Sequence, residues 1–431
     1  YYALNKNTIY KYIKREMDLR PLCKYGEKCY RYKIFILKIR TTSSTDEELV
    51  KKNKIDDEAV DETEDKNSDD EDVKKSVETG SSKADSEKEE EKEATKRKES
   101  EPVDEVDDSE APKSPEDIKE NIKQKYLVEF AEDFYQMWEF CKKENPGNPE
   151  ETFKSSLGFT LVGPFDILAG KHKGVKINSR GKRPNYLLHW RYYYDPPEFT
   201  TIINGDRQSQ FHLGYYRDDP AEMPAFVAAN SAKENGNIVF RGQNLFASLK
   251  YFLEEKIKSK DVSSDLKKKT ESLLKRFLEY AEEHGMDLDY KSQVTKNRDK
   301  KVVCKTLHGA GIVVPVDENE VGYRPVPETP ADLRKMLRKI AESKTDKERD
   351  KNFEPLQELI TYIQFANDEC DYGEGLELGL DLFTHGGSVF HATILSLLPL
   401  AYQLLRRDEY SKIIAAHIKK RRHIADLSEL V

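Results

Sequence analysis

One long segment that cannot fold by itself sets the organisation of this chain. Residues 41–115 consist mainly of Glu, Asp, Lys and Ser, with almost no aromatic side chains. Such a composition buries too little apolar surface to offset the entropy lost on ordering, so we expect a disordered acidic linker. This linker carries more negative charge than the formal net charge of −9 of the whole chain, and net charge therefore does not exclude a role beside nucleic acid. Its tripeptide Lys96-Arg97-Lys98 fits either a nuclear localisation signal or the charge alternation of a solvated linker.

The length and the cysteines bound the class of protein. The 431 residues leave room for two domains beside the linker. The five cysteines are scattered and odd in number, which argues against a disulfide framework and for a reducing compartment. No apolar run reaches the length of a membrane span, because Pro399 interrupts the longest one, residues 394–405. No hydrophobic signal segment lies near the start, so we expect no membrane association.

A short segment before the linker, residues 1–40, is basic and aromatic. It contains the sequence RPLCKYGEKCYR, in which Cys23 and Cys29 lie beside Tyr and Arg. Two cysteines at this spacing could form half of a zinc site, but a complete site needs two further ligands. The following YKIFILKIR supplies none, and the next histidine is His172, beyond the linker. We therefore expect Cys23 and Cys29 to be remnants of a zinc-finger-like segment that no longer holds the metal.

Residues 116–255 are predicted to form an α+β domain with an antiparallel sheet. One helix is expected from Pro115 to Phe140, because aromatic residues recur on one face before Pro146 and Gly147. The aromatic block YLLHWRYYY at 186–194 is β-prone and fits a core strand better than a surface that stacks bases. Further strands are expected within 157–170 and at 199–203, 210–216, 226–229 and 237–240, with a turn at Asn204-Gly205-Asp206.

Residues 256–431 are predicted to form a second, mostly helical domain, so the fold class is α+β. The basic stretch 291–316 includes LHGAGIVVPV and is expected to be a loop that leads to a short strand. A proline-bearing loop at 320–329 carries Tyr323 and Arg324. Helices are expected at 245–253 and 266–284, from Thr329, from Pro355, and at 389–405 and 410–418.

The most informative stretch is YIQFANDECDYGEGLELG, residues 362–379, at the end of the helix expected from Pro355. One stripe of this helix is apolar and should face a core: Leu356, Leu359, Ile360, Ile363 and Ala366. At roughly 100° per residue, Tyr362, Phe365 and Glu369 fall on the opposite side. An outward Phe one turn before an outward Glu indicates a surface that a partner covers. Gly373 and Gly375 are expected to stop the helix.

Three acids, Asp368, Glu369 and Asp371, crowd this helix end against the electrostatics. A helix C-terminus is a negative pole, and neighbouring carboxylates repel one another, which raises their pKa values. Such conflicts mark functional sites, although a solvated acidic helix end is the competing interpretation. No phosphate loop, metal motif or nucleophile elbow is found, and His189, His308, His385 and His391 lack metal-ligand spacing. A base accompanied only by Arg324 suggests half of an active site.

Several strings in the folded region resemble the histone PARylation factor 1 family: FANDECDYG with GLELG, LLHWRYYYDPPEF, KVVCKTLHGAGIVVPVDENEVGYR and LLPLAYQLL. The resemblance covers roughly residues 120–431. In that family an α+β domain precedes a helical one, and the protein binds the catalytic domain of DNA-damage-activated poly(ADP-ribose) polymerases. It completes a composite active site and redirects ADP-ribose transfer from NAD to serine, notably on histones. The resemblance implies no cofactor of its own, since the polymerase binds NAD.

The resemblance also implies roles for single residues. Glu369 matches the catalytic glutamate, and Asp368 matches the acid that helps to organise the joint site. Tyr323 and Arg324 match a pair implied in docking to the polymerase, and Phe365 and Asp371 complete the expected partner-binding set. The segment CKYGEKCYR resembles a poly(ADP-ribose)-binding zinc finger of some relatives, but it lacks the two expected histidines. Binding of poly(ADP-ribose) by this segment is the corresponding expectation.

On this resemblance we expect a nuclear protein at chromatin and DNA damage sites that is monomeric alone. Two other classes stay open from the residues themselves. An autonomous hydrolase could use Asp368 and Glu369 as an acid–base pair, although adjacent helical residues diverge by roughly 100°. A chromatin adaptor could use the acidic face only to bind basic histone tails. Activity with and without a polymerase separates these classes.

Overall fold

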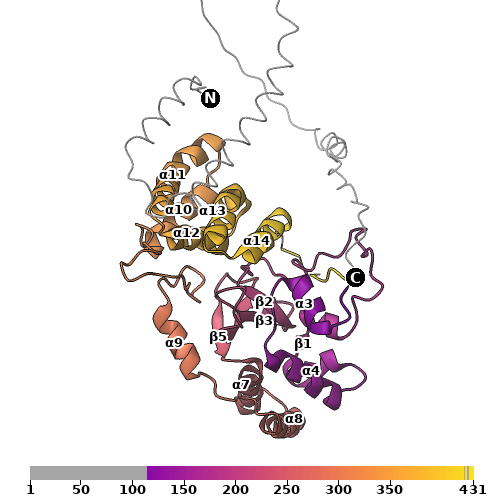
Figure 1. Cartoon of the computed structure of the whole chain (residues 1–431). Helices are drawn as coiled ribbons and strands as arrows, with labels where there is room; N and C mark the ends of the chain where they lie inside the picture. Colours follow the sequence, from indigo (N-terminus) through magenta and orange to yellow (C-terminus); the bar gives the residue numbers. More distant parts are fainter. Residues whose placement is uncertain (1–113, 422, 425–426) are drawn as a thin grey trace, which may run out of the picture. The chain divides into compact units, whose positions relative to one another are not determined.

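The computed structural model describes residues 114–421, 423–424 and 427–431 (Figure 1). The chain divides into two units, Tyr1–Glu101 and Pro102–Val431, and every described residue belongs to the second. The predictions for the linker up to residue 113, and for Cys23 and Cys29, therefore lie outside the described residues. The following description concerns the second unit alone.

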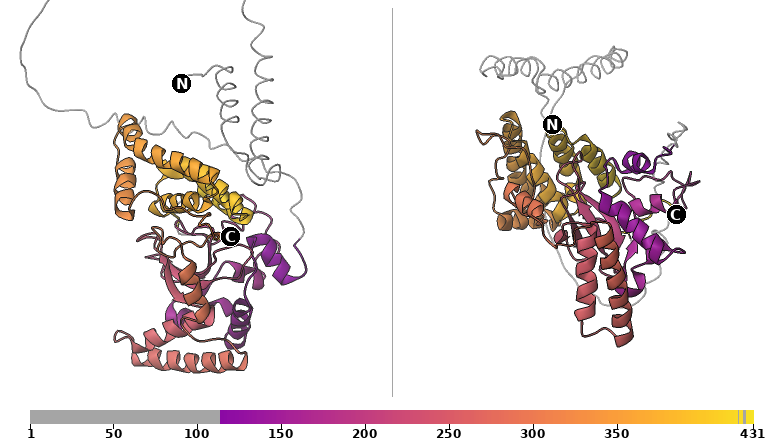
Figure 2. Two further views of the ribbon diagram at one scale, coloured as in Figure 1. Left: turned by 60° about the vertical axis from the view of Figure 1, so that its left-hand side comes forward. Right: turned by 60° about the horizontal axis from the view of Figure 1, so that its bottom comes forward.

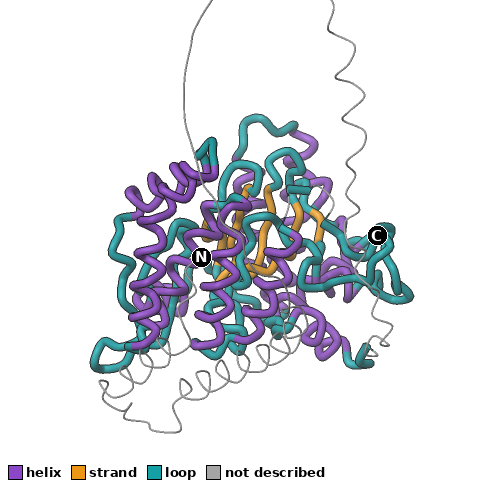
Figure 3. The backbone as a smooth tube through the Cα atoms, turned by 90° about the horizontal axis from the view of Figure 1, so that it is seen from above, coloured by secondary structure: helices purple, strands orange, loops and turns teal. Residues whose placement is uncertain are grey.

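A five-stranded antiparallel sheet forms the frame of this unit, as the sequence predicts (Figure 3). The strands follow one another in chain order, and in the central pair Phe211 lies opposite Ser231 and Tyr216 opposite Phe226. Gly214 allows the close packing of this sheet, because a Cβ there would lie 2.5 Å from Phe199 Cε1. The strands are β1 (Thr160–Leu161), β2 (Phe199–Asn204), β3 (Phe211–Tyr216), β4 (Phe226–Ser231) and β5 (Val239–Gly242).

The single helix expected from Pro115 to Phe140 is in fact two helices. The first, α3 (Ile118–Tyr126), ends where Leu127 adopts a left-handed conformation with φ 63°. The second, α4 (Glu132–Glu144), begins after this turn. Aromatic residues on both sides of the break face the same core, and the rings of Tyr126 and Phe130 lie edge to face at 6.0 Å. The apolar pattern continues through the turn between the two helices, so the pattern alone predicts one helix and does not show the break.

The aromatic block 186–194 forms turns rather than the strand that its composition predicts. Trp190 has φ 56°, which is incompatible with an extended strand. The ring nitrogens of His189 and Trp190 contact the same oxygen, Asp166 Oδ2, at 2.9 and 3.0 Å. The prediction was wrong because β-propensity measures how well a side chain fits a half-buried surface, and a turn that lines the core offers the same burial.

The second half of the unit is helical, as expected, and α10–α14 group beside one another (Figure 2). Two details differ from the predictions. A helix, α9, occupies part of the loop expected at 291–316, and Cys304 and Ile312 form an isolated β-bridge in place of the expected short strand. The helices are α9 (Gln293–Lys301), α10 (Pro330–Ala341), α11 (Asp346–Asp368), α12 (Tyr372–His385), α13 (His391–Leu404) and α14 (Asp408–Lys420).

Two of the remaining helices precede β1 in the chain, three lie between β1 and α9, and a short one precedes α13. They are η2 (Pro149–Glu151), α5 (Lys154–Leu157), α6 (Pro164–Leu168), α7 (Leu245–Lys258) and α8 (Ser264–Glu283), and η3 (Ser388–Phe390) precedes α13. In the described part of the chain, none of the helices has the length and apolarity needed to cross a membrane.

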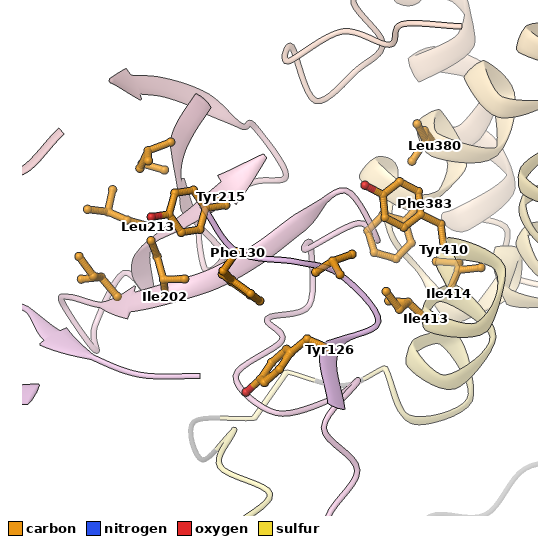
Figure 4. Packing of buried hydrophobic residues seen from close by; sticks show 14 of the residues in the cluster. Tyr126, Phe130, Ile202, Leu213, Tyr215, Leu380, Phe383, Tyr410, Ile413 and Ile414 are labelled. Atoms are coloured by element: carbon orange, nitrogen blue, oxygen red, sulfur yellow. The ribbon is translucent and has the colours of Figure 1, made fainter. Parts of the chain in front are cut away.

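One hydrophobic cluster extends from the sheet into the helices (Figure 4). It includes Ile202 and Leu213 from the strands and Phe383, Tyr410 and Ile414 from α12 and α14, all fully buried or nearly so. Shared burial of this kind holds the helices that carry the acidic stretch against the sheet. The domain boundary predicted at 255/256 stays a prediction.

Candidate functional site at the junction of two helices

The acidic stretch lies at the junction between α11 and α12. The C-cap of α11 is Glu369, and Cys370 follows it with φ 72°. The N–H of Asp371 donates to Ala366 O at 2.9 Å, and that of Cys370 to Asn367 O at 3.3 Å. These two bonds define a Schellman motif, which ends a helix through a left-handed residue. Glu369 is therefore the last residue of a closed turn and projects from the helix end.

Two predictions about this helix were wrong in detail. Pro355 lies inside α11, and the helix begins earlier, after its N-cap Thr345. The hydroxyl of Thr345 accepts the Glu348 N–H at 3.2 Å. The helix ends at Asp368, with Glu369 as its C-cap and the left-handed Cys370 after it, and not at Gly373 and Gly375, which both lie in α12. Glycine is the usual left-handed residue, so a cysteine in that role hid the helix end. Gly373 is needed for packing, since a Cβ there would lie 2.9 Å from Tyr323 Cδ2.

The outward face of α11 has the composition that the helical spacing predicts. Phe365 is 54% exposed and Tyr362 40% exposed, whereas Leu356, Ile363 and Ala366 are buried. The side chain of Glu369 is 58% exposed. Exposed aromatic residues of this size are unusual on a surface that only water contacts, and here they stand next to the carboxylate. Asp368 is also exposed, and it has interactions of its own.

Arg324 lies between two of the acids and offsets their repulsion. Its Nη2 lies 3.0 Å from Asp371 Oδ2 and also contacts Glu369 Oε2. The Glu369 carboxylate, followed by Asp371, raises the pKa of Arg324 above its ordinary value. The structure thus brings together three of the predicted site residues, Arg324, Glu369 and Asp371. The guanidinium and the Glu369 carboxylate are both close to half exposed, so their pairing is accessible to a competitor.

The loop that carries Arg324 is fastened to the start of α12. Asp371 is largely buried, and its Oδ1 accepts the N–H of Gly322 at 2.9 Å. The N–H of Gly373 returns a bond to Gly322 O at 3.0 Å. A Cβ at Gly322 would lie 2.0 Å from Pro315 O, and its φ is 136°, so glycine is required there. Asp371, expected to contact a partner, thus holds the loop in place within this chain.

Sequence reasoning missed Glu377, which anchors the same loop from one side. Its Oε2 accepts the hydroxyl of Tyr323 at 3.0 Å and the N–H of Val326 at 3.2 Å, and its Oε1 accepts the thiol of Cys304 at 3.0 Å. Tyr323, expected to dock a partner, thus turns its hydroxyl inward. The available signal was the spacing of Glu374, Glu377 and Asp381, which places three acids on one face of an otherwise apolar helix.

The two other acids of that face, Glu374 and Asp381, are buried, and their pKa values are raised. Burial raises the pKa of Glu374 to about 7, and its Oε2 lacks a hydrogen-bond partner among the described residues. Burial likewise raises the pKa of Asp381 to about 7, although the N–H of Leu307 donates to its Oδ1 at 2.7 Å. A carboxylate deprived of water is costly in the charged form, which explains both directions. These groups belong to the support of the site and do not reach its surface.

The other candidates lie away from the acidic junction. Among the described residues no group of three or more His, Cys, Asp or Glu side chains could hold a metal ion. His308 is buried, and burial lowers its pKa to about 3. A cavity of about 590 Å³ lies between α4, α5 and α8, and one of about 530 Å³ lies beside His172. Neither cavity is lined by Glu369 or Arg324.

Comparison with known proteins gives one consistent result. Residues 117–421 match the family model described as histone PARylation factor 1. A relative named histone PARylation factor 1 from Bos taurus is 51% identical over 311 residues, which cover 71% of this chain and 88% of the relative. Proteins of the same name from Mus musculus and Danio rerio are 49% and 46% identical, and the aligned parts cover 87% and 86% of their lengths. The matched region contains the whole acidic junction.

Proposed function

The chain belongs to the histone PARylation factor 1 family, and on that premise we propose that it is an accessory factor of serine ADP-ribosylation. It binds the catalytic domain of a DNA-damage-activated poly(ADP-ribose) polymerase. There it contributes Glu369 as the general base that lets a serine hydroxyl accept ADP-ribose from NAD. Histones are the expected substrates, and the nucleus, at chromatin and DNA damage sites, is the expected location. The protein uses no cofactor of its own, because NAD belongs to the polymerase.

The observation that carries this proposal is the placement of Glu369. It is an exposed carboxylate on a fixed helix end, next to the exposed rings of Phe365 and Tyr362. A base in open water has little catalytic use, because water competes for every contact. When a partner covers the aromatic face, the carboxylate lies at the edge of a closed interface. Arg324, half exposed beside it, is available to exchange its intramolecular carboxylates for those of the partner.

The chemistry assigned to Glu369 is the removal of one proton. A serine hydroxyl is a weak nucleophile near neutral pH and needs an adjacent base. In the proposed step the serine Oγ forms a bond to the ribose carbon that bears nicotinamide, the bond to nicotinamide breaks, and Glu369 takes the hydroxyl proton. General-base assistance of this kind typically contributes roughly 10²- to 10⁴-fold in rate. The exposed Asp368 adds negative charge that favours a basic residue next to the acceptor serine.

The test is a reconstitution with purified components. The protein is incubated with NAD and a serine-containing histone peptide, with and without the catalytic domain of the polymerase. We expect serine modification only when both proteins are present. Serine modification or NAD turnover without the polymerase would instead support an autonomous enzyme. A mixture in which the polymerase modifies the same residue types as it does alone would support a chromatin adaptor and overturn the proposal.

A further inference from the structure

Helix α9 presents a cationic ridge that the proposed function does not use. Its outward residues recur at three- and four-residue spacing, which places them on one side of a helix. The ridge consists of exposed amides and lysines: Gln293, Lys296, Asn297, Lys300 and Lys301. The other exposed residues of this helix are Val294 and Asp299. The acid within this helix, Asp299, is paired with Lys291, whose Nζ lies 2.6 Å from its Oδ2. The acids of the preceding turn, Asp287 and Asp289, leave the C-terminal half as the most cationic part.

The opposite side of α9 is fastened to the sheet. Arg298 makes a two-point contact with Asp218, from Nε to Oδ2 at 2.9 Å and from Nη2 to Oδ1 at 2.7 Å. Its Nη1 donates to Ala310 O at 2.6 Å. Thr295 is buried, and Ser292 caps the helix by accepting the N–H of Thr295. A nine-residue helix is marginal by itself, so these anchors fix both its existence and the direction of the lysines.

We propose that this ridge binds the phosphate backbone of duplex DNA. Lysine ammonium groups and amide donors are among the groups that contact DNA phosphates. Lysine is depleted in protein–protein interfaces, so a ridge of lysines fits a polyanion better than a protein. The ridge contains no aromatic residue, whereas proteins that bind flexible single strands use aromatic side chains to stack bases. Figure 1 shows α9 below the group of helices that includes α11, so the ridge and the acidic junction are formed by separate elements.

The size of the ridge sets the expected effect. From Gln293 to Lys301 the helix rises about 12 Å, a length along which duplex DNA carries roughly seven phosphate charges. Three lysines can thus neutralise three phosphates in one stretch of backbone. Each such contact contributes about 0.9 to the slope of log K against log salt. Removing all three charges should lower the magnitude of this slope by nearly 3.

The experiment uses the full chain and a fluorescently labelled 30-base-pair duplex. Binding is measured by fluorescence anisotropy between 50 and 200 mM salt, for the wild type and for the triple variant Lys296→Gln, Lys300→Gln and Lys301→Gln. The matched control neutralises three exposed lysines that lie among acids around the start of α11: Lys344, Lys347 and Lys351. Poly(ADP-ribose) and single-stranded DNA of equal charge serve as competitors. Serine modification of a free peptide, with polymerase present, reports on folding and on the acidic junction.

We expect the α9 variant to bind the duplex more weakly and with the reduced slope, while the control variant behaves like the wild type. Both variants should retain activity on the free peptide, so that a failure of this inference differs from a failure of the proposed function. An unchanged slope in the α9 variant would overturn the inference. A loss confined to poly(ADP-ribose) or single-stranded DNA would overturn it too, and would assign the ridge to a flexible polymer. Equal losses in both variants would show only a general effect of charge, again against a built site.

Discussion

Arg324 forms an ion pair with Glu369 across the junction of α11 and α12, from a loop that the α12 residues Glu377 and Gly373 and the adjoining Asp371 hold in place. The free protein therefore keeps its proposed base neutralised by its own cation. Under the proposed function, a partner that attracts the guanidinium would release the carboxylate as the interface closes around it. Docking would then be coupled to the availability of the base.

Replacement of the base should separate catalysis from binding. We expect Glu369→Gln to bind the polymerase as well as the wild type, while serine modification falls by roughly 10²- to 10⁴-fold. Modification of acidic residues should persist, because an ionised carboxylate acceptor needs no base. The readout is the ratio of serine to glutamate modification at saturating protein, and Glu279→Gln on α8 is an exposed control. Near-normal serine modification by Glu369→Gln would leave the acidic stretch as a docking surface only.

Removal of the cation should affect the complex far more than the fold. The pair between Arg324 and Glu369 is about half exposed, and Asp371 keeps the bond from the Gly322 N–H, so Arg324→Ala should change the free energy of unfolding by no more than about 1 kcal/mol. Binding to the polymerase should weaken by about 2–5 kcal/mol, measured by calorimetry, because a buried interfacial charge loses its partner. Arg349→Ala removes a comparable surface ion pair from the start of α11 and should leave binding unchanged. Undiminished affinity of Arg324→Ala would show that Arg324 is no anchor.

The bond between Tyr323 and Glu377 should position Arg324 indirectly. Tyr323→Phe removes one hydrogen bond to a buried carboxylate, which typically costs about 1–3 kcal/mol. We expect a correspondingly lower melting temperature and weaker docking, with serine modification restored at saturating protein. A double-mutant cycle with Glu377→Gln should give a coupling energy above about 0.5 kcal/mol in docking. Additive effects would indicate that Tyr323 contacts the partner directly, as the resemblance to the family suggested.

Stability should depend on pH through the buried acids of α12. Burial raises the pKa of Asp381 from 3.8 to about 7, so the folded state holds a proton that the unfolded state has released. The free energy of unfolding should therefore fall as pH rises from about 4 to 7, and level off above pH 7. Asp381→Asn keeps an acceptor for the Leu307 N–H and removes the Asp381 share of this dependence, while Glu374, whose pKa burial also raises to about 7, keeps its own share. Urea unfolding should show a gain for the variant that is larger at pH 8 than at pH 5 by about 1–3 kcal/mol. A gain of equal size at both values would assign the effect to packing.

The segment before residue 114 should be dispensable for activity on a peptide. The family match begins at residue 117, and the hydrophobic cluster begins at Ile122. A protein of residues 114–431 should therefore unfold at the same temperature as the full chain and direct modification to serine at the same rate. Loss of peptide activity on truncation would place a necessary element in the removed segment. Nucleosomes, on which other contacts contribute, are the contrasting substrate for comparing the truncated protein with the full chain.

The apolar stripe and the exposed face of α11 could be predicted from spacing alone, because a long amphipathic helix repeats its signal many times. Phe365 outward and Ile363 inward follow directly from the helical period. The start and the end of α11 could not be predicted from the sequence, since they depend on single residues. Thr345 competed with Pro355 as a start signal, and Cys370 took the left-handed place that glycine usually fills.

Polar contacts between residues far apart in the chain could not be predicted from the sequence either. Nothing near Glu377 in the chain announces that it binds Tyr323 and Cys304, residues from loops that precede it by more than fifty positions. The pairing of Arg324 with Glu369 was likewise invisible, although both residues were predicted to belong to the site. Sequence patterns identify which face a residue occupies, whereas its hydrogen-bond partner depends on the complete fold.

The close contact between α12 and α13 makes the site vulnerable from a distance. A Cβ at Gly379 would lie 2.5 Å from Leu398 Cδ2, so even one methyl group would act as a wedge between the two helices. The N-terminal half of the same helix, just before Gly379, holds the Arg324 loop through Gly373 and Glu377. A genetic screen for loss of serine modification should therefore recover alleles at Gly379 and similar small residues, and some should be temperature-sensitive. Such an allele would abolish serine modification by changing the distance between two helices, although every acidic residue of the site is unchanged.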